Sequence, residues 1–517
     1  MPAPMLLLLG AAAIQRGGWL SHGTGSRMLP QLARCARATR TTPFALEGQQ
    51  VEQAHAQPPD EMAGAPSATV EILSFAIPVL GACLAEPLLS MIDTLCIGRL
   101  SHGSASAALA ALGVNAAIFN VVTCSTAFLC TASTAVIGSL PAEAEHASND
   151  SGDGSAPALQ PLVHSNQVSC AFADGMLLAV LLGLMIGTIT QMACGPLLAR
   201  FYHLQRGTAV YGLATSYLRI RALAAPAATA TLVGAGIAFG LGDSRTPLFA
   251  VLAAMIINLA GDIFLVPRFG LVGAAIATAS ATWAGAITLS SILARRLRPV
   301  WRLPQPKGIE PFLRFSAVLL AGTTLASVAY ACTTSVVAAS GSLTQIAAHQ
   351  VALQGWWLLS FASVPLSLAG QSLLPPLLRS APARAWSMCQ TLLLLGAAAS
   401  VPLALVNFLL CTRLTSVFVS DAAVAAQLRS IAVPATFAQL GINVATALDG
   451  AFIGCGRLGH YLGVMAAASG ALGVVFAGAL VAGRAGLRSA WVALAIFSCL
   501  RCVAHLVGLR GLKNEHT

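Results

Sequence analysis

The chain has 517 residues, of which 56% are hydrophobic and only 9% are charged, and its mean hydropathy is +0.78. This composition excludes an array of soluble domains and is typical of a polytopic membrane protein. The net charge of +10 indicates no nucleic-acid partner, because the basic residues gather in the N-terminal segment, in residues 295–307 and near the ends of apolar runs, where membrane proteins keep them.

Residues 1–66 differ in composition from the rest of the chain. Five arginines precede the first acid, Glu47, and a segment rich in Arg and poor in acids is typical of an organelle transit peptide. A secretory signal is the alternative, because residues 5–14 are apolar, although no basic residue precedes them. We expect a disordered transit peptide that leads to a plastid membrane, with a mitochondrial or secretory-route membrane as the alternatives.

From residue 70 onward, about twelve runs reach the roughly 20 apolar residues that a membrane-spanning helix needs. They begin near residues 71, 105, 168, 208, 247, 271, 311, 344, 386, 422, 460 and 487. Backbone polar groups in lipid must be paired within the segment, so these runs predict helices. The sequence therefore predicts an all-α protein with 12 transmembrane helices, and the acidic, turn-rich residues 141–161 predict a flexible loop.

An internal repeat divides these spans into two halves. Three short segments of the first half match segments of the second half in the same order: residues 109–114 with 346–351, 236–242 with 450–456 (both G-x-x-x-G-x-G), and 270–275 with 486–491. Parallel repeats of six helices are typical of secondary transporters. We expect two pseudo-symmetric six-helix lobes, at residues 70–297 and 309–511, joined by a loop at 298–308.

Five of the 18 acids fall within predicted spans, where a charge is costly unless it faces a protein interior or a water-filled cavity: Glu86, Asp93, Asp174, Asp262 and Asp449. Glu86 and Asp93 are two turns apart on one helix face, and Pro87 between them predicts a helix bend. Asn258 and Asp262 share a face of the fifth span. Two acids and an amide in one place would bind a proton or a small cation; the alternative is a polar pair that only joins helices.

Four segments carry a family resemblance: "LLSMIDTLCIGRLS", "GLGDSRTP", "NLAGD" and "GLVGAAIAT". In this order they resemble the multidrug and toxic compound extrusion (MATE) family, in particular its DinF-like branch of plant and algal plastid type, over about residues 70 to 510. The resemblance implies a cation or proton-coupling site made of Asp93, Asn258, Asp262 and Thr278, with Thr282, one turn later, as the alternative to Thr278. In sodium-coupled relatives of a different branch, the seventh span carries an acid, whereas residues 317–339 hold none. The resemblance therefore favours protons over sodium ions as the coupling ion.

Other polar or aromatic residues in the spans are candidates for a substrate cavity: Glu86, His349, Gln350, Trp356 and Asp449. Packing is the alternative for His349, Gln350 and Trp356, and pairing or capping is the alternative for Asp449. Arg219 and Arg221 border the fourth span, where arginine usually reaches the headgroups; attraction of anionic substrates is the other interpretation. A lone Cys499-x-x-Cys502 followed by His505 predicts no metal site.

These observations predict a monomeric secondary active antiporter that exports organic compounds, either drug-like cations or organic and phenolic anions, in exchange for H+ or Na+. It is expected to be no enzyme and to need no cofactor or metal, since no nucleotide-binding or hydrolase motif is visible. One alternative is a flippase for lipid-linked precursors of the same superfamily, which would line its cavity with several cations. The other is a membrane scaffold without transport.

Overall fold

The computed structural model describes residues 67–100, 105–140, 166–201, 204–299, 306–339, 342–415 and 421–516. All regular secondary structure in these ranges is helical, which confirms the predicted all-α fold. Within them, nine helices are long and apolar enough to cross a membrane, or up to eleven if each of two bent pairs is one span. The number of 12 spans and the lobe boundaries stay predictions, and the transit peptide and the loop at 141–161 lie outside the described residues.

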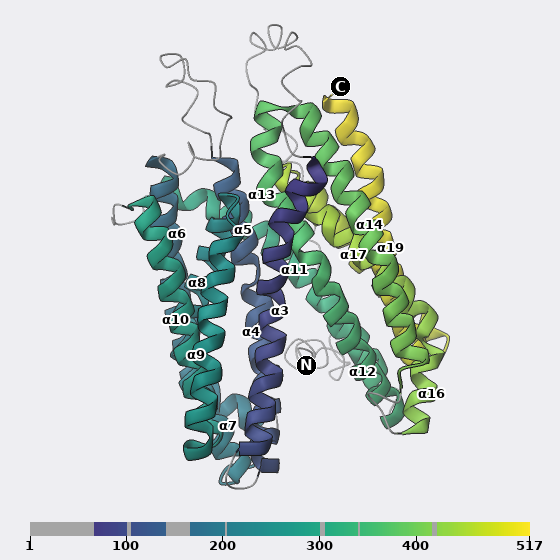
Figure 1. Ribbon diagram of the computed structural model, residues 1–517. Coiled ribbons are helices and arrows are strands. Elements are labelled where there is room, and N and C mark those ends of the chain that lie inside the picture. The colour runs from purple at the N-terminus through teal and green to yellow at the C-terminus, as the bar shows by residue number, and fades with distance from the viewer. Residues whose placement is uncertain are drawn as a thin grey trace, which may run out of the picture.

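The first half of the chain forms one bundle, on the left of Figure 1. Its helices are α3 (Ala68–Leu100), α4 (Ala105–Thr126), α5 (Phe128–Ser139), α6 (Asn166–Pro196), α7 (Ala209–Ala222), α8 (Ala225–Gly240), α9 (Arg245–Phe269) and α10 (Leu271–Leu297). A break between α7 and α8 bends that pair by 47°. Pro226 lies in the first turn of α8, a position that tolerates a residue without an N–H group.

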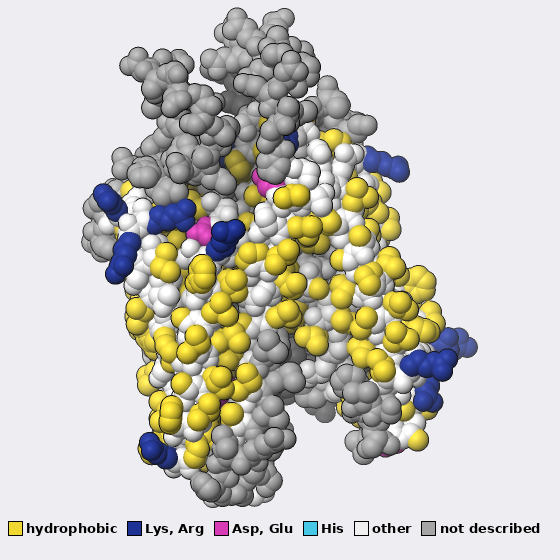
Figure 2. All heavy atoms as spheres, viewed as in Figure 1, with side chains coloured by type: hydrophobic (Ala, Val, Ile, Leu, Met, Phe, Trp, Pro, Cys, Tyr) yellow, Lys and Arg dark blue, Asp and Glu magenta, His cyan; other side chains and the backbone are white. Residues whose placement is uncertain are grey.

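The second half forms the other bundle, on the right of Figure 1. Its helices are α11 (Pro306–Ala339), α12 (Leu343–Ser360), α13 (Val364–Ser380), α14 (Pro382–Thr412), α16 (Ala422–Ser430), α17 (Ala432–Gly454), α18 (Leu458–Val481) and α19 (Leu487–His516). The two bundles, here called the N-lobe and the C-lobe, meet near the end where α3 begins and α19 finishes, and they diverge toward the opposite end. The molecule is therefore V-shaped, and Figure 2 shows the hollow between its arms.

The repeated G-x-x-x-G-x-G segments build the same turn in both lobes. Gly242 after α8 has φ +77° and Gly456 after α17 has φ +70°, the left-handed region that favours glycine. Each turn closes with the same pair of backbone hydrogen bonds: the N–H groups of residues 242 and 243 reach the carbonyls of 239 and 238, and those of 456 and 457 reach 453 and 452. The repeat seen in the sequence is thus a repeat of local structure.

The first glycine of each segment also has the same task. A Cβ on Gly236 would clash with the carbonyl oxygen of Cys130 on α5, and a Cβ on Gly450 would clash with the carbonyl oxygen of Ser367 on α13. The α8 helix therefore lies on α5 in the N-lobe as α17 lies on α13 in the C-lobe, with backbones in direct contact. The two lobes share this packing unit.

Polar contacts link the lobes at their closed end. The Arg384 guanidinium on α14 pairs with Glu71 on α3 at 2.8 Å. Arg379 near the end of α13 donates to the carbonyl oxygens of residues 138, 139 and 140, which form the C-terminal end of α5. The sides of both arms carry exposed hydrophobic side chains, such as Ile256 (70% exposed) and Val481 (91%). Figure 2 shows this apolar belt with Lys and Arg toward the ends of the helices, as in a protein surrounded by lipid.

Candidate functional site

Three helices of the N-lobe bring two carboxylates to one amide. Asn258 on α9 donates through Nδ2 to Asp93 Oδ1 on α3 at 2.7 Å and to Asp262 Oδ2, one turn along its own helix, at 3.1 Å. All three side chains are buried, with exposures of 7% for Asp93 and 0% for Asn258 and Asp262. The third helix, α10, packs along α9 and contributes Thr278. We call Asp93, Asn258, Asp262 and Thr278 the N-lobe site.

Thr278 contacts Asp93, whereas the contacts found for the alternative residue Thr282 are with other residues. The Thr278 hydroxyl is 3.4 Å from Asp93 Oδ2 and 2.8 Å from the carbonyl oxygen of Ala274. Its one proton therefore goes either to its own helix or to the carboxylate. Thr282 instead donates to the carbonyl of Thr278 and accepts a 3.5 Å contact from Arg221 Nη1.

The charges of the N-lobe site are not balanced by its own members. Among the described residues, no Lys, Arg or His forms an ion pair with Asp93 or Asp262. The buried oxygens Asn258 Oδ1 and Asp262 Oδ1 have no hydrogen-bond partner there. Two carboxylates and two free oxygen acceptors in a buried space can take a proton or coordinate a small cation, because either lowers the cost of buried negative charge.

An aromatic and cationic wall lies next to this site. The Tyr217 hydroxyl on α7 contacts Thr278, and Arg221, Asp93 and Asp262 are charged groups close to it. The Arg221 guanidinium stacks over the Phe119 ring at 4.8 Å, and its Nε has no hydrogen-bond partner in the described part of the chain. Arg221 thus faces the lobe interior. Arg219, in contrast, is exposed and contacts Cys194 Sγ at 3.4 Å.

The site lies toward the open end of the V. Asp93 is seven residues before the last residue of α3, and Asp262 is seven before the last residue of α9. Both positions are about 10 Å along the helix axis from those ends, at 1.5 Å per residue. Glu86 and Pro87 also lie in α3, but their side chains are outside the described residues. Asp174, also in the N-lobe, is 1% exposed in α6 and is separate from this site.

The predicted substrate-cavity residues of the C-lobe lie in its packed interior. His349 is 1% exposed, with its Nε2 3.1 Å from the Thr334 hydroxyl and its ring near Trp491. Trp356 is fully buried, and its ring packs edge-on against Tyr330 at 5.6 Å. Gln350 is half-buried. The structure does not bring these residues to the N-lobe site.

Asp449 forms a second polar cluster that the sequence did not reveal. Its carboxylate is buried in α17 and accepts from two side chains of α19, Arg501 and His505 Nε2, the latter at 2.8 Å. In the sequence analysis, His505 drew attention only as a neighbour of Cys499 and Cys502. In the described residues both cysteines are free, and no group of three or more metal-ligating side chains is found. The available signal was the spacing of Arg501 and His505, one helical turn apart in an otherwise apolar span.

Comparisons with known proteins agree with this fold. Two family models match: the one described as MatE over residues 164–264, and the one described as Lipid II flippase MurJ over residues 237–351. Protein DETOXIFICATION 44, chloroplastic, of Arabidopsis thaliana is 29% identical over 449 residues, covering 84% of this chain and 81% of that protein. Protein DETOXIFICATION 43 of the same organism is 29% identical over 479 residues, covering 84% and 89%.

Solved structures share this fold over most of the chain. A multidrug resistance MATE family transporter in an outward-facing conformation matches with a TM-score of 0.70 and 18% identity, covering 87% of this chain and 96% of that chain. The bent form of the MATE transporter VcmN of Vibrio cholerae matches with a TM-score of 0.72 and 16% identity, covering 87% and 98%. These likenesses show the fold, and together with the sequence relatives they confirm the resemblance to the MATE family predicted from the sequence.

Proposed function

This chain is a multi-pass membrane protein that resembles the MATE transporters over most of its length, and from this premise we propose that it is a secondary active antiporter. It exports organic compounds, either drug-like cations or organic and phenolic anions, in exchange for H+ or Na+. The observation that carries the proposal is the N-lobe site, where α3, α9 and α10 gather two buried carboxylates that no cation of the described residues neutralises.

In the proposed cycle, a proton enters the N-lobe site from the open end of the V. Protonation of Asp93 or Asp262 removes one of two buried negative charges, so α3 repacks against α9 and bends at Pro87. Deprotonation restores the arrangement that accepts substrate from the opposite side. Such a cycle requires ligands that bind the two arrangements unequally, and a shift from 1:99 to 99:1 needs a difference of about 10⁴-fold, or about 5.5 kcal/mol.

Protons are the proposed coupling ion, because residues 317–339 of α11 supply no acid for a cation site in the C-lobe. Arg221, which faces the interior beside Tyr217, supplies a positive charge for an anionic substrate. The residues proposed for a cavity in the C-lobe, His349, Gln350 and Trp356, would have to become accessible during the cycle. The protein acts as a monomer in this proposal.

We place the protein in a plastid membrane. The Arg-rich composition of residues 1–66 and the chloroplastic name of one relative support this placement. The test is a fusion of residues 1–66 to a fluorescent reporter. Import into plastids is the expected result, and a mitochondrial or secretory pattern would reassign the membrane.

Transport is tested with purified protein in proteoliposomes under an imposed pH gradient, with a cationic dye and an aromatic carboxylate as probes. We expect the wild type to move one of them and Asp93→Asn to lose that flux while it remains folded. Asp421→Asn is the matched control, because Asp421 is an exposed N-cap of α16 and asparagine caps equally well. Equal flux in Asp93→Asn and wild type would refute coupling through Asp93. No flux under either a proton or a sodium gradient would contradict the antiporter proposal and favour a membrane scaffold without transport.

A flippase for lipid-linked precursors is the second candidate function, and the MurJ match over residues 237–351 favours it. The two functions differ in where the substrate enters: from water between the arms or laterally from the bilayer. A fluorescent lipid-linked probe in the same proteoliposomes distinguishes them. Transfer of the probe between leaflets, without flux of the dye or the carboxylate, would replace the antiporter proposal.

A further inference from the structure

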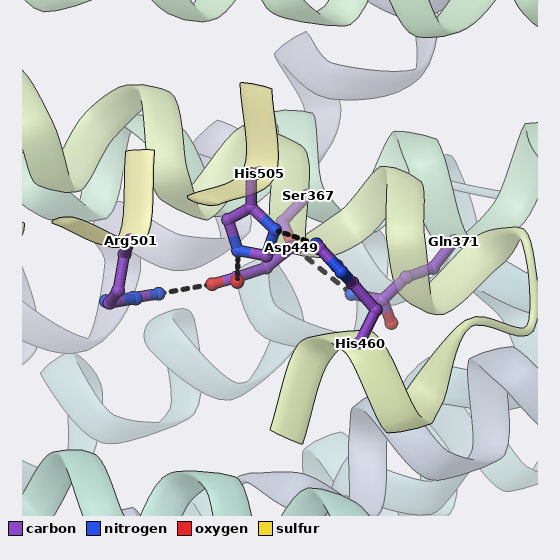
Figure 3. A network of polar contacts seen from close by, with 6 residues as sticks. All are labelled: Ser367, Gln371, Asp449, His460, Arg501 and His505. Atoms are coloured by element: carbon purple, nitrogen blue, oxygen red, sulfur yellow. Dashed lines mark hydrogen bonds and ion pairs between the residues drawn. The ribbon is translucent and has the colours of Figure 1, made fainter. Parts of the chain in front are cut away.

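The polar cluster in the C-lobe is a continuous hydrogen-bonded chain that joins three helices (Figure 3). His460 on α18 lies with its Nε2 3.3 Å from His505 Nδ1 on α19, and His505 Nε2 lies 2.8 Å from Asp449 Oδ1 on α17. The other carboxylate oxygen of Asp449 accepts from Arg501. His505 is fully buried and Arg501 is 3% exposed, whereas His460 is half-buried. The chain therefore has one accessible end, at His460, and one closed end, at the ion pair.

The donors and acceptors of this chain fix its direction when both histidines are neutral. A carboxylate paired with Arg501 accepts only, so His505 donates from Nε2 and its Nδ1 must accept. His460 then donates from Nε2 to His505 Nδ1. Every hydrogen of the neutral chain thus points toward Asp449.

One added proton reverses a single link and breaks none. If His505 becomes an imidazolium ion, its Nδ1–H donates to His460 Nε2 and its Nε2–H still donates to Asp449. A second added proton places donors on both sides of the link between the imidazoles and removes that hydrogen bond. The pair is therefore built to hold one added proton between its two rings, beside a carboxylate that offsets the positive charge.

The surroundings allow one added charge. Asp449 and Arg501 balance each other, so the cluster is neutral before the proton arrives. The charged or titratable groups that interact with His460 are His505, Asp449 and Arg457, the last in the turn before α18. Tyr461 on α18 and Tyr330 on α11 interact with the ion pair. The Phe452 ring lies against both imidazoles, with centroid distances of 4.0 Å to His460 and 5.0 Å to His505, and shields the link from water.

The cluster also lies next to the glycine packing unit that is repeated in each lobe. Asp449 immediately precedes Gly450, the glycine whose backbone touches Ser367 on α13. Ser367 in turn accepts a hydrogen bond from Gln371 one turn later, and the far end of α13 carries Arg379, which binds the end of α5 in the N-lobe. A proton on the imidazoles beside Asp449 therefore adds a positive charge close to the contact with α13, the helix that binds the N-lobe.

We propose that His460, His505 and Asp449, with Arg501 as the fixed counter-charge, form a second proton-binding site, which takes up one proton through His460 on the closed-end face of the protein. The proposal extends the proposed antiport function, because the N-lobe site would receive protons from the open end and this cluster from the opposite face. The two sites together would let the lobes respond to the pH on both sides of the membrane.

Proton binding is measured without transport, by potentiometric titration of purified protein in detergent between pH 8 and pH 5. The variant is His460→Gln/His505→Gln, because glutamine places an N–H near the position of Nε2 but takes up no proton. We expect the double variant to bind about one proton fewer than the wild type, since the pair shares one. No difference would mean that the histidines are a static part of the fold, and a difference of two would mean that they titrate independently; either result overturns the proposal.

Flux separates this proposal from the proposed function. If the wild type transports, the single variants His460→Gln and His505→Gln should shift the pH dependence of flux on the closed-end side, whereas Asp93→Asn abolishes flux at every pH. Because His460 is half-buried, His460→Gln should fold, and it provides the test if His505→Gln fails to fold. If the wild type does not transport, the titration still decides whether the site binds a proton. An unchanged pH dependence in both variants would refute a role in the cycle.

Discussion

The two lobes share a packing unit but treat buried charge in opposite ways. In the N-lobe, Asp93 and Asp262 are bridged by the amide of Asn258, and no cation of the described residues pairs with them. In the C-lobe, one carboxylate, Asp449, is held by a guanidinium and an imidazole. The first arrangement leaves negative charge for a mobile ion to neutralise, and the second is neutral until a proton arrives. Similar backbone scaffolds can therefore hold a buried carboxylate with or without a fixed counter-charge, depending on which partners the neighbouring helices supply.

The largest expected effect is a loss of stability when the ion pair of the C-lobe cluster is broken. Arg501→Met removes the guanidinium and leaves the buried carboxylate of Asp449 with only the His505 imidazole among the described residues. Removal of one partner of a buried pair costs about 3–5 kcal/mol. The measurement is the free energy of unfolding in detergent, by chemical denaturation. The double variant Asp449→Leu/Arg501→Met should recover much of the loss, because neither charge remains. Equal stability of Arg501→Met and wild type would show that the pair is not desolvated as described.

The shared packing unit is tested next, at equivalent positions in the two lobes. Gly236→Ala and Gly450→Ala each insert a methyl group against a backbone carbonyl, and overpacking of this kind costs about 1–3 kcal/mol. Both variants should lose a similar amount in the same unfolding experiment. Gly473→Ala is the control: its site on α18 is open, so alanine should be neutral or stabilising by up to about 1 kcal/mol. Loss in only one lobe would contradict the structural repeat.

Asp262→Asn should have the opposite profile to Arg501→Met: little change in stability and a large change in transport. The substitution keeps the shape and removes a buried charge that lacks an ion-pair partner, so the free energy of unfolding should stay the same or rise. Proton-driven flux in proteoliposomes should fall at least about tenfold, equivalent to 1.4 kcal/mol. Asp421→Asn serves again as the control. Marked destabilisation with normal flux would make Asp262 a structural residue.

Local properties of the sequence predicted much of this molecule. The starts expected near residues 247 and 271 agree with α9 at Arg245 and α10 at Leu271, because hydropathy and turn residues act over a few positions. The shared face of Asn258 and Asp262 follows from helical periodicity alone. The bridge from Asn258 to Asp93 spans 165 positions, and it was expected only from the family resemblance.

Partners that tertiary packing alone brings together could not be predicted. Asp449 meets Arg501 and His505 across 52 and 56 positions, and no local pattern pairs α17 with α19. The pairing alternative for Asp449 was open in the sequence, but its partners were not identified. Likewise, nothing in the sequence distinguished Arg221, which turns inward to Phe119, from Arg219, which is exposed.

The smallest expected effect on flux tests whether Thr278 or Thr282 is the fourth member of the N-lobe site. The Thr278 hydroxyl shares its proton between Ala274 and Asp93, and its contact with Asp93 is long, at 3.4 Å. A hydrogen bond of this kind contributes about 0.5–1 kcal/mol, so Thr278→Val should weaken the proton dependence of flux by about 2- to 5-fold. Thr282→Val removes a hydroxyl one turn away that contacts Arg221 instead, and it should leave that dependence unchanged. If Thr282→Val weakened the proton dependence and Thr278→Val did not, the coupling role would belong to Thr282, one helical turn later on α10.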